Sequence, residues 1–311
     1  MIRKILSTLV LIFGLSFLYL YTYQKSTIKY LMYNFVYKYE AKSEAVSTYK
    51  KGDTYSFVIE TNDFTPKNKE DILNIIFTGL NNGWSKFSFY CSPEYLNCEE
   101  DVRVLAGSPD TLSTLNNFVH PYNSYNKLYM TINAFGKVIV DVEKLYTDEE
   151  ISKLNNMVNS TIDQKTTPNM TLRQKILALH DYIISITDYD FDRARAIETN
   201  AVEEIMPDNK SHLAYGILSE GKAICSGYSD MMSLFLEKLD VPSYKISSDT
   251  HVWNYVNLDN KWYHLDLTWN DPDIEDQRGL THLFFLITTE ELEAKDVEQH
   301  EYDKNIFVEA K

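Results

Sequence analysis

The residues of this chain best suited to covalent chemistry are a cysteine, a histidine and an aspartate that follow one another in its second half. Cys225 lies in the stretch GKAICSGYSD, directly before apolar residues that recur at helical spacing. The first turn of a helix favours a thiolate over a thiol, because free N–H groups and the helix dipole stabilise negative charge there. Cys225 is therefore a candidate nucleophile, although free cysteines are also often small buried apolar residues.

A nucleophilic cysteine needs a base and a group that orients the base, and the sequence supplies both downstream. His251 begins one strand-like run, and Asp266 lies in a second run, with Asp259 and Asn260 between the runs as a predicted hairpin turn. An even loop length pairs Leu258 with Lys261 and places His251 and Asp266 on one face as diagonal neighbours. A loop of odd length places them on opposite faces.

Other histidines compete for the same chemistry. His264 lies on the predicted strand of Asp266 and shares the face of His251, so it is an alternative base. His180 falls beside the apolar stripe of a predicted helix, and we interpret it as a structural histidine. His212 and His282 have no partner identifiable from the sequence, and we expect His300 at the surface.

Taken together, GKAICSGYSD, HVWNYV and KWYHLDLTWNDP resemble the transglutaminase-like superfamily, over about residues 170–300. The resemblance is carried by glycines on both sides of the cysteine, a tryptophan two residues after the histidine, and the D-x-T-W-x-D-P run. It implies a papain-like core in which Cys225 is the nucleophile, His251 the base and Asp266 the group that orients the base. It implies no cofactor.

The resemblance also implies acyl transfer through a thioester on a protein or peptide amide. Attack by an amine then gives a cross-link, and attack by water gives deamidation or proteolysis. The glutamine that papain-like proteases carry shortly before the cysteine is absent from residues 217–221, ILSEG. We expect the backbone N–H of Cys225 as one oxyanion donor, with Tyr215 and Trp253 as further oxyanion or cleft candidates. The alternative is a catalytically silent, anchored module that binds peptides or acts as a scaffold.

Composition limits the class of partner. The 311 residues are 44% hydrophobic and 14% aromatic, which is ample for a packed core. The formal net charge of −15 argues against a nucleic acid as partner, because the chain lacks the basic surface that phosphates require. The acidic run at residues 271–276 lacks the glycine and terminal glutamate of an EF-hand calcium loop, and no spacing typical of zinc ligands is present.

The N-terminus has the residue pattern typical of a targeting signal. Residues 5–23 are apolar and uncharged and follow Arg3 and Lys4, which predicts a single transmembrane anchor with the rest of the chain outside the cytoplasm. A cleaved signal peptide, and so a secreted protein, is the alternative. Cys91 and Cys98 form either a local disulfide, which suits an exported protein, or a pair of structural thiols.

The domain organisation follows from these features. We predict an α+β protein with an anchor or signal at residues 1–25, a juxtamembrane linker at 26–50, a small α+β domain at 51–147 and a transglutaminase-like catalytic domain at 148–311. The small domain has a predicted helix at residues 69–80 and predicted strands at 54–60, 86–90, 102–106, 128–133 and 137–142. The catalytic domain has predicted helices at 151–162 and 171–187, and a polar loop at 200–211 ahead of the cysteine. The oligomeric state is not readable from the sequence.

Overall fold

The computed structural model divides the chain into two compact units. It describes residues 2–23, 25–36, 47–52, 55–199, 201–202, 206, 208–271, 280–295 and 298–311. The first unit comprises Met1–Thr48, Val58–Leu112 and Tyr125–Glu143, and the second comprises Tyr49–Phe57, Ser113–Ser124 and Lys144–Lys311. Both units combine helices with antiparallel strands, which confirms the α+β class.

The first unit begins with two helices, α1 (Ile2–Tyr23) and α2 (Lys25–Phe35). The apolar side chains described on α1 are exposed, with Phe13 the most exposed of them. Of the residues described, none forms a helix that is long and apolar enough to cross a membrane, which takes about 20 consecutive apolar residues. The transmembrane helix predicted at residues 5–23 is therefore not found.

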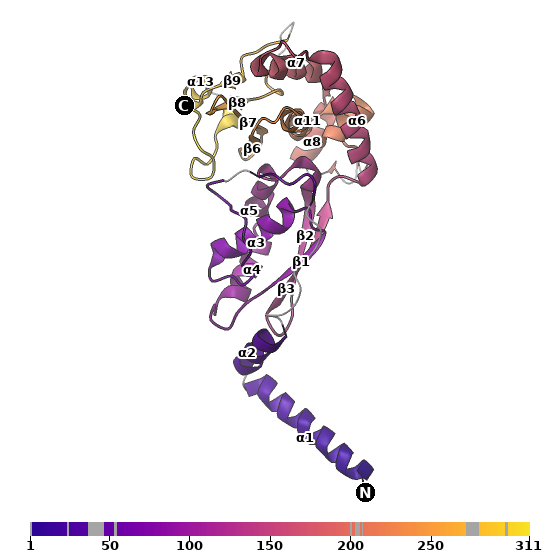
Figure 1. The fold of residues 1–311 in the computed structure, drawn as a ribbon, viewed down its shortest axis with the longest axis vertical. Helices are drawn as coiled ribbons and strands as arrows, with labels where there is room; N and C mark the ends of the chain where they lie inside the picture. The colour runs from indigo at the N-terminus through magenta and orange to yellow at the C-terminus, as the bar shows by residue number, and fades with distance from the viewer. Residues whose placement is uncertain are drawn as a thin grey trace. The chain divides into compact units, whose positions relative to one another are not determined.

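The rest of the first unit is a three-stranded sheet covered by helices (Figure 1). Strands β1 (Lys86–Tyr90), β3 (Lys137–Lys144) and β2 (Tyr125–Ile132) are neighbours in that order. Helices α3 (Lys69–Asn81) and α4 (Cys98–Ala106) contact the sheet and one another, and α5 (Pro109–Thr114) follows. The structure also forms the disulfide between Cys91 and Cys98, the first of the two alternatives above.

Two of the strands predicted in this region are wrong. Residues 102–106 belong to α4, because three acidic residues in its first turn favour a helix start and only Val102 of the apolar residues there is buried. Residues 55–60 form no strand. The backbone N–H of Ile59 bonds instead to the Asn74 side chain of α3.

The second unit contains a four-stranded antiparallel sheet, ordered β6 (Ser243–Ser247), β7 (Val252–Leu258), β8 (Lys261–Leu265) and β9 (Phe285–Ile287). Its helices are α6 (Asp148–Lys165), α7 (Leu172–Ser185), α8 (Phe191–Glu198), α10 (Ala214–Glu220), α11 (Cys225–Lys238) and α13 (Thr289–Glu293). The short strands β4 (Asp188–Tyr189) and β5 (Lys222–Ala223) pair in parallel.

Helices α6 and α7 begin where the sequence predicts. Thr147 caps α6 and Thr171 caps α7, each through a capping box with the third helical residue, Glu150 and Gln174. Both helices then bury an apolar stripe in the core, including Leu154 and Leu179. The helices predicted at 151–162 and 171–187 are therefore confirmed.

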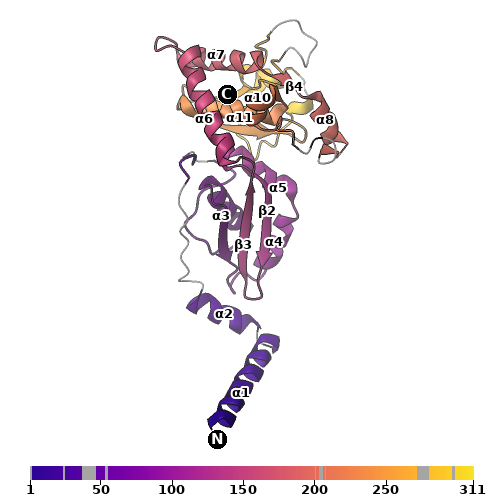
Figure 2. The same cartoon turned by 90° about the vertical axis from the view of Figure 1, so that its right-hand side faces the viewer.

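Helix α11 forms the centre of the second unit (Figure 2). It contacts β6 and β7 on one side and α6, α7 and α10 on the other, so residues 227–236 are all buried. A helix that is buried all round cannot shift without disturbing both layers. Its first residue, Cys225, is therefore held firmly in place.

The hairpin between β7 and β8 has the even loop length on which the site depends. Asp259 and Asn260 form a two-residue turn with φ of 56° and 61°, the left-handed conformation typical of such turns. Leu258 pairs with Lys261 in the observed register. The predicted register is thus confirmed, and it directs His251 and Asp266 to one face.

Candidate active site

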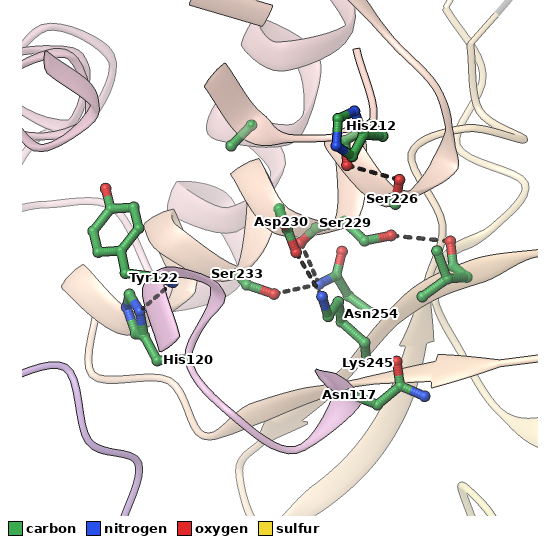
Figure 3. Close-up of polar contacts among 12 residues, drawn as sticks. Asn117, His120, Tyr122, His212, Ser226, Ser229, Asp230, Ser233, Lys245 and Asn254 are labelled. Atoms are coloured by element: carbon green, nitrogen blue, oxygen red, sulfur yellow. Dashed lines mark hydrogen bonds and ion pairs between the residues drawn. The ribbon is translucent and has the colours of Figure 1, made fainter. Parts of the chain in front are cut away.

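Cys225 is the first residue of α11 and lies against the segment that precedes α10. The N–H of Ile224 donates to the carbonyl of Ser211 over 2.9 Å, and the Ser226 hydroxyl donates to the carbonyl of His212 over 2.8 Å (Figure 3). Gly227 permits this close approach, because a Cβ there would lie 2.5 Å from the Ser211 carbonyl oxygen. The glycine after the cysteine is thus required by packing.

Two polar side chains join the first turns of α11 to strand β7. The Ser229 hydroxyl lies 2.8 Å from the carbonyl oxygen of Cys225 and 2.9 Å from that of Val252. The Asn254 amide donates to the Ser229 carbonyl and to the Ser233 hydroxyl, each over 2.9 Å (Figure 3). Because Val252 directly follows His251, these bonds set the distance between the cysteine and the histidine.

A buried ion pair fixes the next turn of α11. The Lys245 ammonium group on β6 donates to Asp230 Oδ1 over 2.6 Å (Figure 3). The Tyr146 hydroxyl donates to Asp230 Oδ2 over 2.7 Å and accepts from the Ala214 N–H over 2.9 Å. Removal of one partner from such a buried ion pair strongly destabilises a folded protein, because the other charge is left buried and unpaired. These bonds link α11 to β6 and to the start of α10.

His251 lies between the carboxylate and the thiol. Its Nε2 is 2.6 Å from Asp266 Oδ2, and Cys225 lies close enough to the ring to act on its pKa. His251 and Asp266 are both buried, 5% and 1% exposed. With Nε2 occupied by Asp266, Nδ1 is the nitrogen that faces the thiol. The structure therefore brings the three predicted residues together in the order Cys225, His251, Asp266.

Electrostatics favour the charged form of His251. Burial alone lowers the pKa of this imidazole, but the Asp266 charge and hydrogen bond, together with Cys225, raise it to about 10. For Asp266 burial raises the carboxyl pKa, but the charge and hydrogen bonds of the two neighbouring histidines hold it well below its usual range. At neutral pH the site thus contains an imidazolium beside the Asp266 carboxylate.

The structure places His300 in this site, not at the surface. Its Nε2 is 2.8 Å from the same Oδ2 of Asp266 that bonds to His251, and the residue is 6% exposed. It lies in a short 3₁₀ turn, Glu298–His300, that follows α13. No local pattern in the sequence marks such a turn, so the expectation of a surface histidine was wrong.

Trp253 and His264 have structural functions. Trp253 is fully buried, stacks on His251 with ring centroids 5.6 Å apart, and donates its indole N–H to His264 Nδ1 over 3.0 Å. It therefore cannot donate to an oxyanion or line an open cleft. His264 Nε2 bonds to the Thr289 hydroxyl, and burial lowers the His264 pKa to about 3. Both of its nitrogens are occupied, which excludes His264 as the alternative base.

A different tyrosine from the predicted one lies near the nucleophile. Tyr215 contacts Lys153 on α6, with the ammonium group 3.4 Å from its hydroxyl, and none of the contacts described for it involves Cys225. Tyr189 pairs instead with Ala223, two residues before Cys225. Burial first, and then the Cys225 charge, raise the Tyr189 pKa to about 12. The two-residue strand that carries Tyr189 is too short to show a period in the sequence.

A second histidine cluster consists of His180 and His282, which share the Asp181 carboxylate. Asn270 accepts from the Phe284 N–H with Oδ1, so its Nδ2 donates to His180 Nε2 over 2.9 Å. His180 Nδ1 must then carry the hydrogen that it shares with Asp181 over 2.8 Å, and His282 bonds to the same carboxylate oxygen over 2.8 Å. A metal bound at His180 Nδ1 would require the hydrogen of the imidazole to be on Nε2. That nitrogen accepts a hydrogen bond from Asn270, so His180, Asp181 and His282 do not suit a metal. His180 is structural, as predicted, and His282 has a partner.

Two predicted loops fall partly outside the described residues. They are the polar loop at 200–211, of which residues 200, 203–205 and 207 are not described, and the acidic run at 271–276, of which only Asp271 is. Asp271 is buried and accepts the Tyr228 hydroxyl over 2.5 Å.

Comparison with known proteins gives partial structural likenesses. No protein-family model matches the chain, and no curated protein matches it. The chain is similar to a solved transglutaminase (TGase), with 16% identity over 47% of this chain and 44% of that one and a TM-score of 0.36. It is also similar to a proposed cysteine protease from Cytophaga hutchinsonii, with 12% identity over 48% of this chain and 63% of that one and a TM-score of 0.28. The chain thus spans less than two thirds of either structure.

Proposed function

We propose that this chain is a cysteine-dependent enzyme that transfers the acyl group of a protein or peptide amide through a thioester. One observation carries the proposal: His251 is hydrogen-bonded to Asp266 and lies close enough to Cys225 for the cysteine to act on its pKa, inside a buried site. A nucleophile, a base and a group that orients the base are the minimal set for this chemistry.

In the first step the Cys225 sulfur attacks the carbonyl carbon of the amide. A C–S bond forms, and the carbonyl π electrons move to the oxygen. When the tetrahedral species collapses, the C–N bond breaks and the His251 imidazolium gives its proton to the departing nitrogen. The products are ammonia or an amine, a thioester on Cys225 and a neutral imidazole.

In the second step an amine or a water molecule attacks the thioester. His251 takes the proton of the attacking group, the C–S bond breaks, and the thiolate and imidazolium are restored. Attack by an amine gives a new amide, and attack by water gives a carboxylate. Asp266 keeps one tautomer of His251 in place through both steps.

The oxyanion of each step needs hydrogen-bond donors beside Cys225. The backbone N–H of Cys225 is available, because the first N–H groups of a helix have no acceptor within it. We propose the Tyr189 hydroxyl as the second donor. Tyr189 pairs with Ala223, two residues before Cys225, and Cys225 is the second of the causes that raise the pKa of its phenol, after burial.

The proposed substrates are proteins or peptides of the cell envelope or outside the cell. Support comes from the disulfide between Cys91 and Cys98, since disulfides persist mainly outside the reducing cytosol. The net charge of −15 would further favour peptides without excess acidic residues.

The purified chain would be incubated with a blocked glutamine peptide, with and without a primary alkyl amine, and the products analysed by mass spectrometry. Transfer gives a peptide that gains one amine and loses one ammonia, and hydrolysis gives the glutamate peptide. A longer peptide in the same assay reports cleavage of the backbone.

The matched control is Cys225→Ala, which should give none of these products. Failure of the wild-type chain to form any of them, together with binding of the same peptides, would favour the silent binding module instead.

A further inference from the structure

We propose that His300 is a fourth, positioning member of the Cys225 site, which holds the Asp266 carboxylate in the orientation that His251 requires. This inference rests on the proposed function, because it assigns His300 to the same reaction.

The first argument is the sharing of one oxygen. Asp266 Oδ2 accepts from His251 over 2.6 Å and from His300 over 2.8 Å, while Oδ1 accepts from the Trp269 N–H over 3.2 Å. A carboxylate with one acceptor bond can rotate about its Cβ–Cγ bond. Bonds to both oxygens, from three directions, fix the plane of the Asp266 carboxylate.

The second argument is the packing of the His300 ring. It stacks on Phe284 with centroids 5.2 Å apart and an interplanar angle of 15°. The edges of the ring meet Trp253 and His251 at near right angles, with centroids 4.9 and 5.2 Å apart. These rings leave His300 a single orientation, so the donor that it presents to Asp266 is itself fixed.

The third argument concerns the hydrogen positions. A carboxylate oxygen only accepts, so both histidines must carry a hydrogen on Nε2. His300 Nδ1 is buried and has no partner among the described residues. Two imidazoles and a carboxylate also resemble a metal site, but a ligating histidine usually donates its outer N–H to an acceptor, and His300 has none. The arrangement thus fits a hydrogen-bonded clamp better than a metal site.

Several titratable groups surround this clamp. His251 and His300 bond to Asp266, Cys225 lies beyond His251, and His300 is one of the groups that lower the pKa of His264. Glu298 and Glu301 line a pocket beside His300, of about 430 Å³. Loss of the His300 donor removes one of the hydrogen bonds that lower the pKa of Asp266. The pKa of Asp266 should therefore rise, and the acid limb of the pH profile of kcat should move with it.

The test compares His300→Phe, which keeps the stacking but removes the donor, with His300→Gln, whose amide nitrogen can take the place of Nε2. His120→Phe is the matched control, since His120 is equally buried in the same unit but bonds to Glu237 and the Tyr122 N–H. Each purified chain would be assayed for turnover of the glutamine peptide and for alkylation of Cys225 by iodoacetamide, both against pH. Circular dichroism and thermal unfolding identify variants that fail to fold.

For His300→Phe we expect kcat to fall by at least about tenfold, because small displacements of a catalytic group are costly, while KM is unchanged. The acid limb of its pH profile should move to higher pH. His300→Gln should recover most of kcat and the wild-type acid limb. Equal profiles for wild-type and a folded His300→Phe, or no recovery in a folded His300→Gln, would overturn the proposal.

Alkylation separates this inference from the proposed function. If the wild-type chain turns over no peptide, but alkylation of Cys225 slows in His300→Phe and recovers in His300→Gln, the positioning function stands and only the proposed reaction is wrong. If wild-type turns over the peptide and His300→Phe matches it in both assays, the reaction stands and this inference is wrong.

Discussion

His251 keeps its proton in a buried site because the charge of Asp266 outweighs the cost of burial. The imidazolium gains its full stabilisation below the ordinary histidine pKa of about 6.5 and loses it as the pH rises through the raised value. Since that raised pKa is about 10, we predict that kcat/KM for the glutamine peptide persists through neutral pH and declines with a midpoint near pH 10, because only the imidazolium can give a proton to the departing nitrogen. Steady-state kinetics between pH 5 and pH 11 measure this, and a midpoint near pH 6.5 would contradict the raised pKa of His251.

Asp266→Asn should remove the charge that supports His251. Burial, which lowers the His251 pKa, is then opposed mainly by Cys225, so the alkaline midpoint should move to lower pH. Since positioned acid–base catalysis is worth about 100-fold to 10,000-fold, we expect kcat/KM at pH 7 to fall within that range. The control is Asp181→Asn, which changes the carboxylate of the second histidine cluster and should leave the midpoint in place.

The sequence predicts the three central residues but not their neighbours. Cys225, His251 and Asp266 are recognisable because Cys225 begins a regular helix, while His251 directly precedes β7 and Asp266 directly follows β8, so that period and turn show where their side chains point. His300 and Tyr189 lie in a 3₁₀ turn and a two-residue strand. Such short segments have no period, and the contacts that define them are made with residues far away in the chain.

At the scale of elements, the link between α11 and β7 depends on Ser229. Ser229→Ala removes the hydroxyl shared by the Cys225 and Val252 carbonyl oxygens, so we predict a roughly tenfold fall in kcat from misplacement of Cys225. The loss of stability should be about 1 kcal/mol. Ser219→Ala is the control, because among the described residues that hydroxyl bonds to the Tyr215 carbonyl of its own helix and to no other group. Steady-state kinetics and urea unfolding of both variants test this, and equal kcat values would contradict it.

Gly227→Ala tests the close approach at the start of α11. The added Cβ would lie 2.5 Å from the Ser211 carbonyl oxygen, which is backbone and cannot rotate away. We expect the free energy of unfolding to fall by about 1–3 kcal/mol, as for other overpacked sites. Gly52→Ala, where a Cβ meets nothing within 4 Å, should change it by less than about 0.5 kcal/mol. Urea denaturation followed by tryptophan fluorescence gives both values.

Elements with clear end signals are the ones that the sequence predicts. Helices α6 and α7 carry capping boxes, and the β7–β8 hairpin carries a two-residue turn suited to positive φ. Residues 102–106 predict a strand, because valine and leucine are common in strands and polar and apolar residues alternate there. They are helical because Glu99 to Asp101 form an acidic first turn that favours the start of α4, and these residues lie before the predicted strand.

At the scale of the whole molecule, the disulfide and the candidate active site belong to different compact units. Cys91→Ser combined with Cys98→Ser should therefore destabilise the first unit, by roughly 2–3 kcal/mol from loop entropy. Alkylation of Cys225 should be unchanged. Differential scanning calorimetry and the alkylation rate test the two expectations, and a parallel loss of Cys225 reactivity would contradict the second. Reduction of the wild-type protein should reproduce the effect on stability.

The turn at Asp259 and Asn260 also constrains how this protein can vary. One residue inserted there would move the side chains of β8 to the opposite faces of the sheet. Asp266, which follows β8, would then point away from Cys225, and a neighbouring side chain would point toward it. Two inserted residues would preserve the geometry. In natural variants and engineered ones alike, only insertions of an even number of residues in this turn should keep the site intact. The constraint holds although the turn itself supplies no group to the reaction.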